Sequence, residues 1–506
     1  MKLITTTSLT TLVTLLLPIA PTSSSAFSVS SPTRSTRLHS HERKQEWTNI
    51  PRGGGFAAPS LPRKTTTTTR LSMSAGTAAL EPTGGDSGGV GGGTATIPNE
   101  IFNLVKNIVG AGVLGLSAGI AAFGSAPSAV LPASILIAII GALSGYCFSL
   151  IGRVCAYTGA ETYRAAWDKT VGTSSSWIPA ASVTAKTCLA VLAYSMILAD
   201  TFKALLSTAG VNLSRSGTLF GITGTVLLPL CLMKNLASLA PFSLLGIIGM
   251  GYTTFAMALR YLGGAYKVPN GKFVPDLAAN LQPQFGTAGA NAVFSSKSFV
   301  LICMLGTAFM AHFNAPKFYI ELKDNTIKRY NTVVAISFAI AIAIFAGVAG
   351  LGFLTFGSAS SGLILNNYST KDSLMSLSRV AVAVSIIFSY PLAFTGARDG
   401  ILDLMNVAPS ERSNALLNKL TFGILAGITG LALVIKDLTF LLSIGGATLG
   451  TLLIYVYPAL MFRKVIQGKG DSASKASKRE VLFALFTAFV GSCMGGIGAK
   501  MAIGSL

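Results

Sequence analysis

Long apolar runs follow one another through this chain from residue 101 to residue 499, and only short polar breaks separate them. A run of ~20 apolar residues is long enough to cross the ~30 Å hydrocarbon core of a bilayer as an α-helix. Because no water satisfies backbone groups there, a chain built from such runs must form a helical bundle. We number eleven predicted spans in order, and they cover residues 101–123, 128–156, 179–209, 217–233, 237–259, 298–318, 332–356, 374–395, 415–435, 437–462 and 480–499. The sequence therefore predicts an all-α integral membrane protein that crosses the lipid bilayer many times.

The composition agrees with a membrane protein. Charged residues make up only 11% of the 506 residues and hydrophobic residues 51%, whereas a soluble domain carries roughly 25% charge. The net charge of +20 does not indicate a nucleic-acid partner, because the cations are scattered over short loops and the N-terminal tail. The six cysteines form no C-x-x-C pair, so the sequence predicts neither a disulfide framework nor a metal site.

Residues 1–98 differ from the rest of the chain, being rich in Ser, Thr, Gly and Arg. Residues 1–26 resemble a signal peptide, and the basic, Ser/Thr-rich segment 27–80 has the composition of a transit peptide. The junction Ser25-Ala26-Phe27 resembles the cleavage site of bipartite presequences in algae with secondary plastids. We therefore expect a presequence and disordered linker before a transmembrane domain at 99–500, and a location in a plastid membrane. The alternatives are a disordered cytosolic tail and a vacuolar membrane, another endomembrane or the plasma membrane.

Span 1 contains three glycines within six residues, Gly110, Gly112 and Gly115, in the middle of its apolar run. Glycine weakens a helix and lets its backbone approach another group closely. A break at this depth would free backbone N–H groups at the start of a half-helix, where a carboxylate can bind. The alternative interpretation is tight packing between helices through small residues, which is common in membranes.

Span 6 concentrates polar and helix-breaking residues in a second apolar run. His312, Asn314 and Pro316 lie within five residues, and His312 is the only histidine that follows residues 1–98. Proline removes a backbone hydrogen bond, and a polar side chain at membrane depth is a candidate functional residue. The alternative is a hydrogen bond between helices that only holds the bundle together. Breaks in spans 1 and 6 are where an inverted repeat of five plus five helices would place them, facing one another.

Four segments, with support from a fifth, carry a resemblance to a known family. They are 103–116 in span 1, 193–202 in span 3, 228–236 before span 5, 308–322 in span 6, and Arg379, 389–391 and Arg398 in span 8. Through them the chain resembles the amino acid/auxin permease family of the amino acid–polyamine–organocation superfamily. The resemblance covers about residues 99–500 and is strongest to the sodium-coupled neutral and vacuolar amino acid transporter branches. It implies a LeuT-type fold of about 11 transmembrane helices, with a 5+5 inverted repeat and broken helices 1 and 6.

The resemblance also implies secondary active transport of amino acids, with no cofactor. The substrate carboxylate would bind the backbone at Gly110, Ala111 and Gly112. The ammonium and side chain would be held at the second break, by Ala311, His312, Phe313 and Asn314. We expect the protein to work as a monomer.

The position of the coupling ion departs from the sodium-coupled pattern. Sodium-coupled members tend to carry Asn four residues before the first glycine of span 1, and a Thr on span 8. Here the span 1 position is Lys106, with Asn107 beside it, and span 8 offers Ser385 and Ser389. Proton-coupled members resemble this chain in having a lysine there. The resemblance therefore favours proton coupling or exchange over sodium coupling, unless Lys106 extends to the membrane surface.

Two other functions remain open. The same carboxylate site could take an auxin-like indole or another small carboxylate. The protein could also be an amino-acid sensor whose transport is vestigial. An enzyme is not predicted, because the sequence has no catalytic set around its single membrane-depth histidine.

Overall fold

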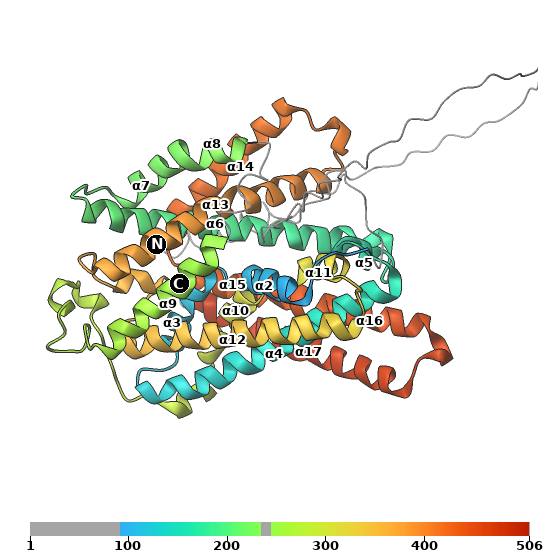
Figure 1. Cartoon of the computed structure of the whole chain (residues 1–506), viewed down its shortest axis with the longest axis horizontal. Coiled ribbons are helices and arrows are strands. Elements are labelled where there is room, and N and C mark those ends of the chain that lie inside the picture. Colours follow the sequence, from blue (N-terminus) through green and yellow to red (C-terminus); the bar gives the residue numbers. More distant parts are fainter. Residues whose placement is uncertain (1–91, 234–243, 505–506) are drawn as a thin grey trace, which may run out of the picture. The chain divides into compact units, whose positions relative to one another are not determined.

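The computed structural model describes residues 92–233 and 244–504 (Figure 1). The predicted signal peptide, transit-like segment and most of the linker lie outside the described residues. From Ile97 onward the described chain forms α-helices, most of them joined by short connections, with a longer connection of loops and short helices at 263–297. No strand longer than an isolated bridge occurs in the described part. The predicted all-α class is confirmed.

The helices follow the predicted spans closely. Spans 1 and 6 are each divided, into α2 (Ile97–Ile108) and α3 (Leu116–Ala121), and into α10 (Ser298–Ala308) and α11 (Ala315–Glu321). The other spans are α4 (Val130–Thr158), α6 (Trp177–Thr208), α7 with α8 (Arg215–Ile222, Leu228–Leu232), α9 (Leu244–Leu262), α12 (Ile327–Phe356), α13 (Ser373–Leu404), α14 (Asn414–Val434), α15 with α16 (Leu438–Gly445, Tyr457–Gly468) and α17 (Lys475–Gly504). Within the described residues, nine helices are long and apolar enough to cross a membrane, or ten with the bent span 1. The one predicted span outside this set is span 5, which corresponds to α9 and begins where the described residues resume.

Several helices begin at a side chain that caps them. Thr96, Thr326 and Asp372 precede α2, α12 and α13, and each accepts a hydrogen bond from a backbone N–H of the first turn. Such caps satisfy donors that have no partner within the helix. Gly159 ends α4 in the left-handed region, at φ 61°, where glycine is favoured. Local sequence thus fixes where these helices start and stop.

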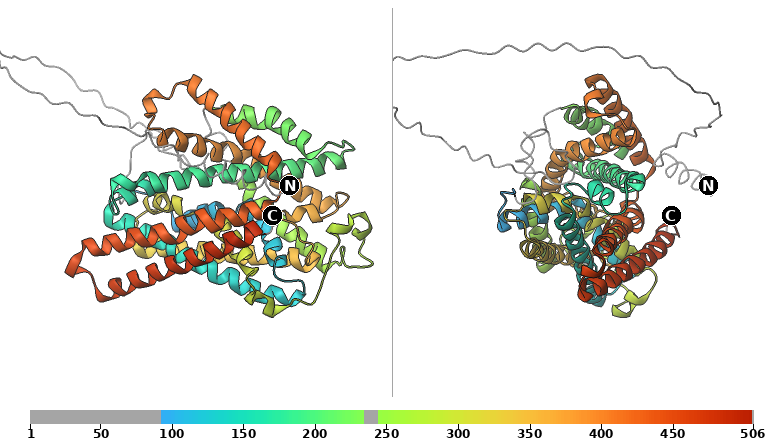
Figure 2. Two further views of the ribbon diagram at one scale, coloured as in Figure 1. Left: turned by 180° about the vertical axis from the view of Figure 1, so that it is seen from behind. Right: turned by 90° about the vertical axis from the view of Figure 1, so that its right-hand side faces the viewer.

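The packing pairs helices that are five spans apart. α4 packs along α12, and α6 packs along α13, so span 2 contacts span 7 and span 3 contacts span 8. The divided spans 1 and 6 complete the series, as the expected inverted repeat of five plus five helices requires. The last two spans, α16 and α17, lie side by side in Figures 1 and 2.

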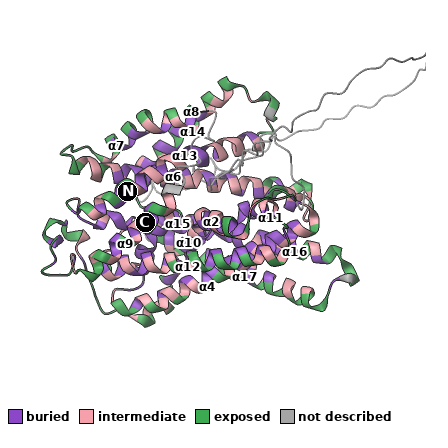
Figure 3. Ribbon diagram, viewed as in Figure 1, coloured by how far each residue is buried: buried purple, intermediate pink, exposed green. Residues whose placement is uncertain are grey.

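Burial distinguishes central from peripheral spans. In span 6, 72% of the residues in the most apolar 18-residue stretch are buried, whereas the corresponding share is 28% in α14 and in α17. Figure 3 shows the burial of each residue along the helices. α17 exposes the large apolar side chains of Phe483, Phe486 and Phe489. Apolar side chains on such outer helices suit a lipid surround. The broken spans therefore lie inside the bundle.

Candidate functional site

The break in span 1 exposes backbone N–H groups that have no partner within the helix. α2 and α3 meet at a bend of 46°, with Gly110 in an extended conformation before the short helix η1 (Ala111–Gly115). The first N–H groups of a helix have no partner within it, and no side chain caps this end of η1. The N–H groups of Ala111 and Gly112 are therefore positioned like those that bind carboxylates at helix N-termini.

The glycines of span 1 serve two different purposes. A Cβ atom at Gly110 would meet nothing within 4 Å, and one at Gly112 would make only an ordinary contact, 3.9 Å from the Cα of Ala308. At Gly115, by contrast, a Cβ would lie 2.8 Å from Leu442 Cδ1. Tight helix packing therefore explains Gly115 but not Gly110, where the absent side chain leaves room beside the backbone.

The break in span 6 lies between α10 and α11 and contains the short helix η9 (His312–Asn314). Pro316 is in the first turn of α11, where a missing N–H costs little. It therefore starts the second half-helix and does not kink a continuous one. All the residues from Ala311 to Pro316 are buried.

The side chains of His312 and Phe313 point toward two neighbouring helices. The Nε2 atom of His312 lies 2.9 Å from the backbone oxygen of Ser144 in α4, to which it donates. The ammonium of Lys186 in α6 lies 4.4 Å from the centre of the Phe313 ring, a favourable cation–π geometry. These contacts attach the second break to α4 and α6.

Asn314 connects the two breaks directly. Its Nδ2 atom donates to the Oδ1 atom of Asn107 in α2 over 3.4 Å, and both side chains are buried. The hydrogen bond is long, so it contributes less than a well-formed one. It nevertheless brings a predicted substrate residue of span 6 to a predicted coupling residue of span 1.

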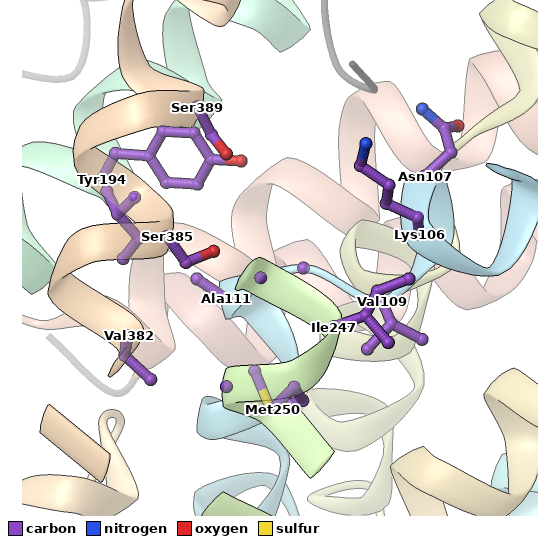
Figure 4. Close-up of a pocket in the computed structure, with 14 residues that line it drawn as sticks. Lys106, Asn107, Val109, Ala111, Tyr194, Ile247, Met250, Val382, Ser385 and Ser389 are labelled. Carbon is purple, nitrogen blue, oxygen red and sulfur yellow. The ribbon is translucent and has the colours of Figure 1, made fainter. Parts of the chain in front are cut away.

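A cavity of about 60 Å³ lies beside the first break (Figure 4). Six of the predicted site residues line it: Lys106, Asn107, Gly110, Ala111, Ser385 and Ser389. Figure 4 shows Ser385 and Ser389 of α13 on one side and Lys106 and Asn107 of α2 on the other. Gly112, Ala311, His312, Phe313 and Asn314 do not line this cavity. The structure thus gathers all four predicted coupling residues around one cavity. The predicted residues of span 6 lie outside its lining, and among them Asn314 contacts the group through Asn107.

Other residues line the cavity that sequence reasoning did not select. Tyr194 of α6 stands beside the two serines in Figure 4, and Gly246 and Gly249 of α9 form another part of the wall. A Cβ at Gly246 would lie 2.7 Å from the Oγ atom of Ser385, so the glycine lets α9 approach α13 closely. Tyr194 lies in one of the motif segments, and that membership is the signal that could have identified it.

The helix packing and the two broken spans define a membrane protein with the LeuT-type fold. The chain belongs to the family described as transmembrane amino acid transporter protein, whose model matches residues 93–503. It is thus a membrane transporter of the amino acid class and not an enzyme.

Several known proteins are similar to this chain. It is 26% identical over 382 residues to the "Putative sodium-coupled neutral amino acid transporter 11" of Danio rerio, a match that covers 74% of this chain and 80% of the relative. The mouse protein of the same name is 23% identical over 387 residues, covering 75% and 80%. Among solved structures, the inward-facing conformation of Mhp1 matches with a TM-score of 0.52 and 13% identity, over 81% of this chain and 89% of that one. The likeness to Mhp1 concerns the fold alone.

Proposed function

We propose that this protein is a secondary active transporter that carries neutral amino acids across a membrane by alternating access, driven by a proton gradient. Its family supports an amino-acid substrate. The names of two similar proteins, both called neutral amino acid transporters, support a neutral substrate. The single observation that carries the proposal is the break in span 1, where uncapped N–H groups adjoin space that no side chain fills. A zwitterion would place its carboxylate there.

The coupling proposal rests on the residues around the cavity. Lys106 brings a positive charge to the space between α2, α9 and α13, and Ser385 and Ser389 face it with hydroxyl groups. The cavity has room for an ion and a few water molecules, since about 10–15 Å³ measured in this way holds one water. A lysine ammonium here can take the place of a bound sodium ion, and a lysine beside a hydrated cavity can exchange a proton with its water.

The experiment is uptake of radiolabelled amino acids into proteoliposomes that contain the full chain. A mixed pool that includes an indole acid is offered, with a proton gradient or a sodium gradient imposed in parallel. One proton carried with each neutral substrate should give ~tenfold accumulation per unit of pH difference. Accumulation under the sodium gradient alone would contradict the coupling proposal and keep the carrier. Uptake of the indole acid alone, or no uptake by folded protein, would contradict the amino-acid substrate.

The variant Lys106→Met tests the lysine itself. We expect it to lose proton-driven accumulation, because the cavity then lacks the group that would exchange the proton. The matched control is Lys203→Met, which changes an exposed lysine of α6 outside the cavity. Equal accumulation by both variants would contradict the role proposed for Lys106.

The membrane in question is also part of the proposal. The composition of residues 1–98 supports delivery to a plastid membrane. A fluorescent protein fused behind residues 1–98 should then enter plastids in cells that contain secondary plastids. A fusion that stays in the cytosol, or reaches the vacuole, would contradict this location.

A further inference from the structure

Glu100 is a buried acidic residue that has no role in the proton-driven transport cycle proposed above. It lies in the first turn of α2, and its side chain is 0% exposed. Neither carboxylate oxygen has a hydrogen-bond partner in the described part of the chain. An ionised carboxylate without a partner is very costly away from water. In this arrangement the side chain is therefore best accommodated in its neutral, protonated form.

The charged groups near Glu100 come from the second half of span 6. They are Glu321, the last residue of α11, and Lys317, one turn earlier. The ammonium of Lys317 lies 3.7 Å from a carboxylate oxygen of Glu321, so the lysine is shared with another acid. Glu100 thus faces a like charge whose positive partner is already engaged. Two carboxylates that share one site do not both ionise easily.

Among the described residues, the other elements near Glu100 supply no further ionised partner. From α12, the hydroxyl of Tyr330 donates to the backbone oxygen of Ala315 over 3.2 Å. The described start of α9, 244–250, carries no titratable side chain. Within α2, Lys106 lies nearly two turns further on and lines the cavity. Burial and the neighbouring carboxylate of Glu321 therefore favour a bound proton on Glu100, and the more distantly engaged ammonium of Lys317 opposes them.

The position of Glu100 links its proton to the movement of two half-helices. Before it, the N–H of Ala95 donates to the backbone oxygen of Glu321, and the N–H of Lys323 donates to Ala95, both over 2.9 Å. After it, Asn107 accepts the hydrogen bond from Asn314. Glu100 lies between these two attachments of span 1 to span 6. If it ionises while they hold, a negative charge is trapped beside Glu321, so ionisation favours separation and hydration.

We infer that Glu100 is a second proton-carrying residue of the transport cycle, which binds a proton when α2 and α11 close together and releases it to water when they separate. This inference rests on the proposed proton-driven transport. The step is a simple protonation, in which a carboxylate takes a proton from water and returns it. Glu100 thereby couples the closure of this side of the bundle to the proton gradient, and accumulation requires both this residue and Lys106.

The test is Glu100→Gln in the full chain, reconstituted in proteoliposomes. Glutamine mimics the protonated acid and cannot release a proton. We expect exchange of internal for external amino acid at equal pH to stay within about twofold of wild type, because the closed arrangement is kept. Accumulation under a proton gradient should fall to equal concentrations inside and outside. A purely structural role would lower both activities together, and unchanged accumulation would overturn the inference.

Two further variants test whether accumulation requires a titratable group at position 100 or any acid in this region. Glu321→Gln removes the half-exposed, lysine-paired acid and should retain accumulation. Glu100→Asp keeps a titratable group and should restore part of it. If wild type accumulates no amino acid at all, the proposed function fails, and that result is distinct from a defect confined to Glu100→Gln.

Infrared spectroscopy provides a readout that does not depend on transport. Wild type at neutral pH should show the band of a protonated carboxyl group, and this band should persist in Glu321→Gln and disappear in Glu100→Gln. If Glu100→Gln does not fold, wild type and Glu321→Gln still decide the matter. Absence of a protonated carboxyl band from both would overturn the inference.

Discussion

The two broken spans differ in how their breaks are packed. In span 1, Gly110 adjoins space that no atom fills, and no side chain caps the following helix. In span 6, His312 is fully buried and donates to α4, while Phe313 contacts Lys186 of α6. The comparison teaches that a break in a helix can leave backbone groups accessible to a ligand, or it can supply side chains that bind neighbouring helices. Substitutions at the two breaks should therefore affect different properties.

Gly110→Val should give the largest effect on transport. The backbone at Gly110 is extended, φ −115° and ψ −173°, so valine fits without strain, and its side chain would fill the space proposed for the carboxylate. We expect uptake to fall by about a hundredfold, as misplacement of a bound group can cause, with thermal stability within a few degrees of wild type. Uptake and unfolding temperature in detergent measure the two properties. Normal uptake would remove the main distinction between the breaks.

His312→Ala should act in the opposite way. It removes the hydrogen bond to the backbone oxygen of Ser144, which contributes about 0.5–1.5 kcal/mol, and it opens a gap beside Phe148. We expect a lower unfolding temperature, while the apparent affinity for substrate in the surviving protein changes little. A large rise in KM at unchanged stability would instead place His312 at the substrate.

Asn314→Ala should produce the smallest effect and sharpen the comparison. The hydrogen bond to Asn107 is 3.4 Å long, and a neutral hydrogen bond contributes about 0.5–1.5 kcal/mol. We expect the transport rate to fall a few-fold, and Asn107→Ala should lower it by a similar factor. The double variant should behave like either single variant if the two side chains act as one contact. Additive losses would show that they act separately.

Much of the fold follows from the local sequence. Span 2 is predicted at 128–156 and α4 covers Val130–Thr158, because twenty or more apolar residues leave few alternatives in a membrane. The start of span 7 is less well predicted: α12 begins at Ile327, five residues before the predicted start. Lys328 and Arg329 interrupt the apolar pattern, so the prediction places the start of the span after them. The cap at Thr326 nevertheless starts the helix before these two residues.

The site is less completely predicted, because it depends on contacts between distant segments. Gly110 and Gly115 look alike in the sequence, and only the close approach of distant residues such as Leu442 and Met304 to Gly115 distinguishes them. Glu100 reads as an ordinary acidic residue in a first helical turn, where a negative charge is favoured at a surface. Its burial arises near α11, which lies more than two hundred residues away in the sequence.

The most direct test of the carboxylate site compares an amino acid with its own amide. Wild-type proteoliposomes take up the radiolabelled neutral amino acid under a proton gradient, in the presence of excess unlabelled acid or unlabelled amide. We predict that the free acid competes strongly and the amide does not, because only the acid carries the carboxylate that the N–H groups of Ala111 and Gly112 would hold. Equal competition by the two compounds would contradict a carboxylate site at the break in span 1.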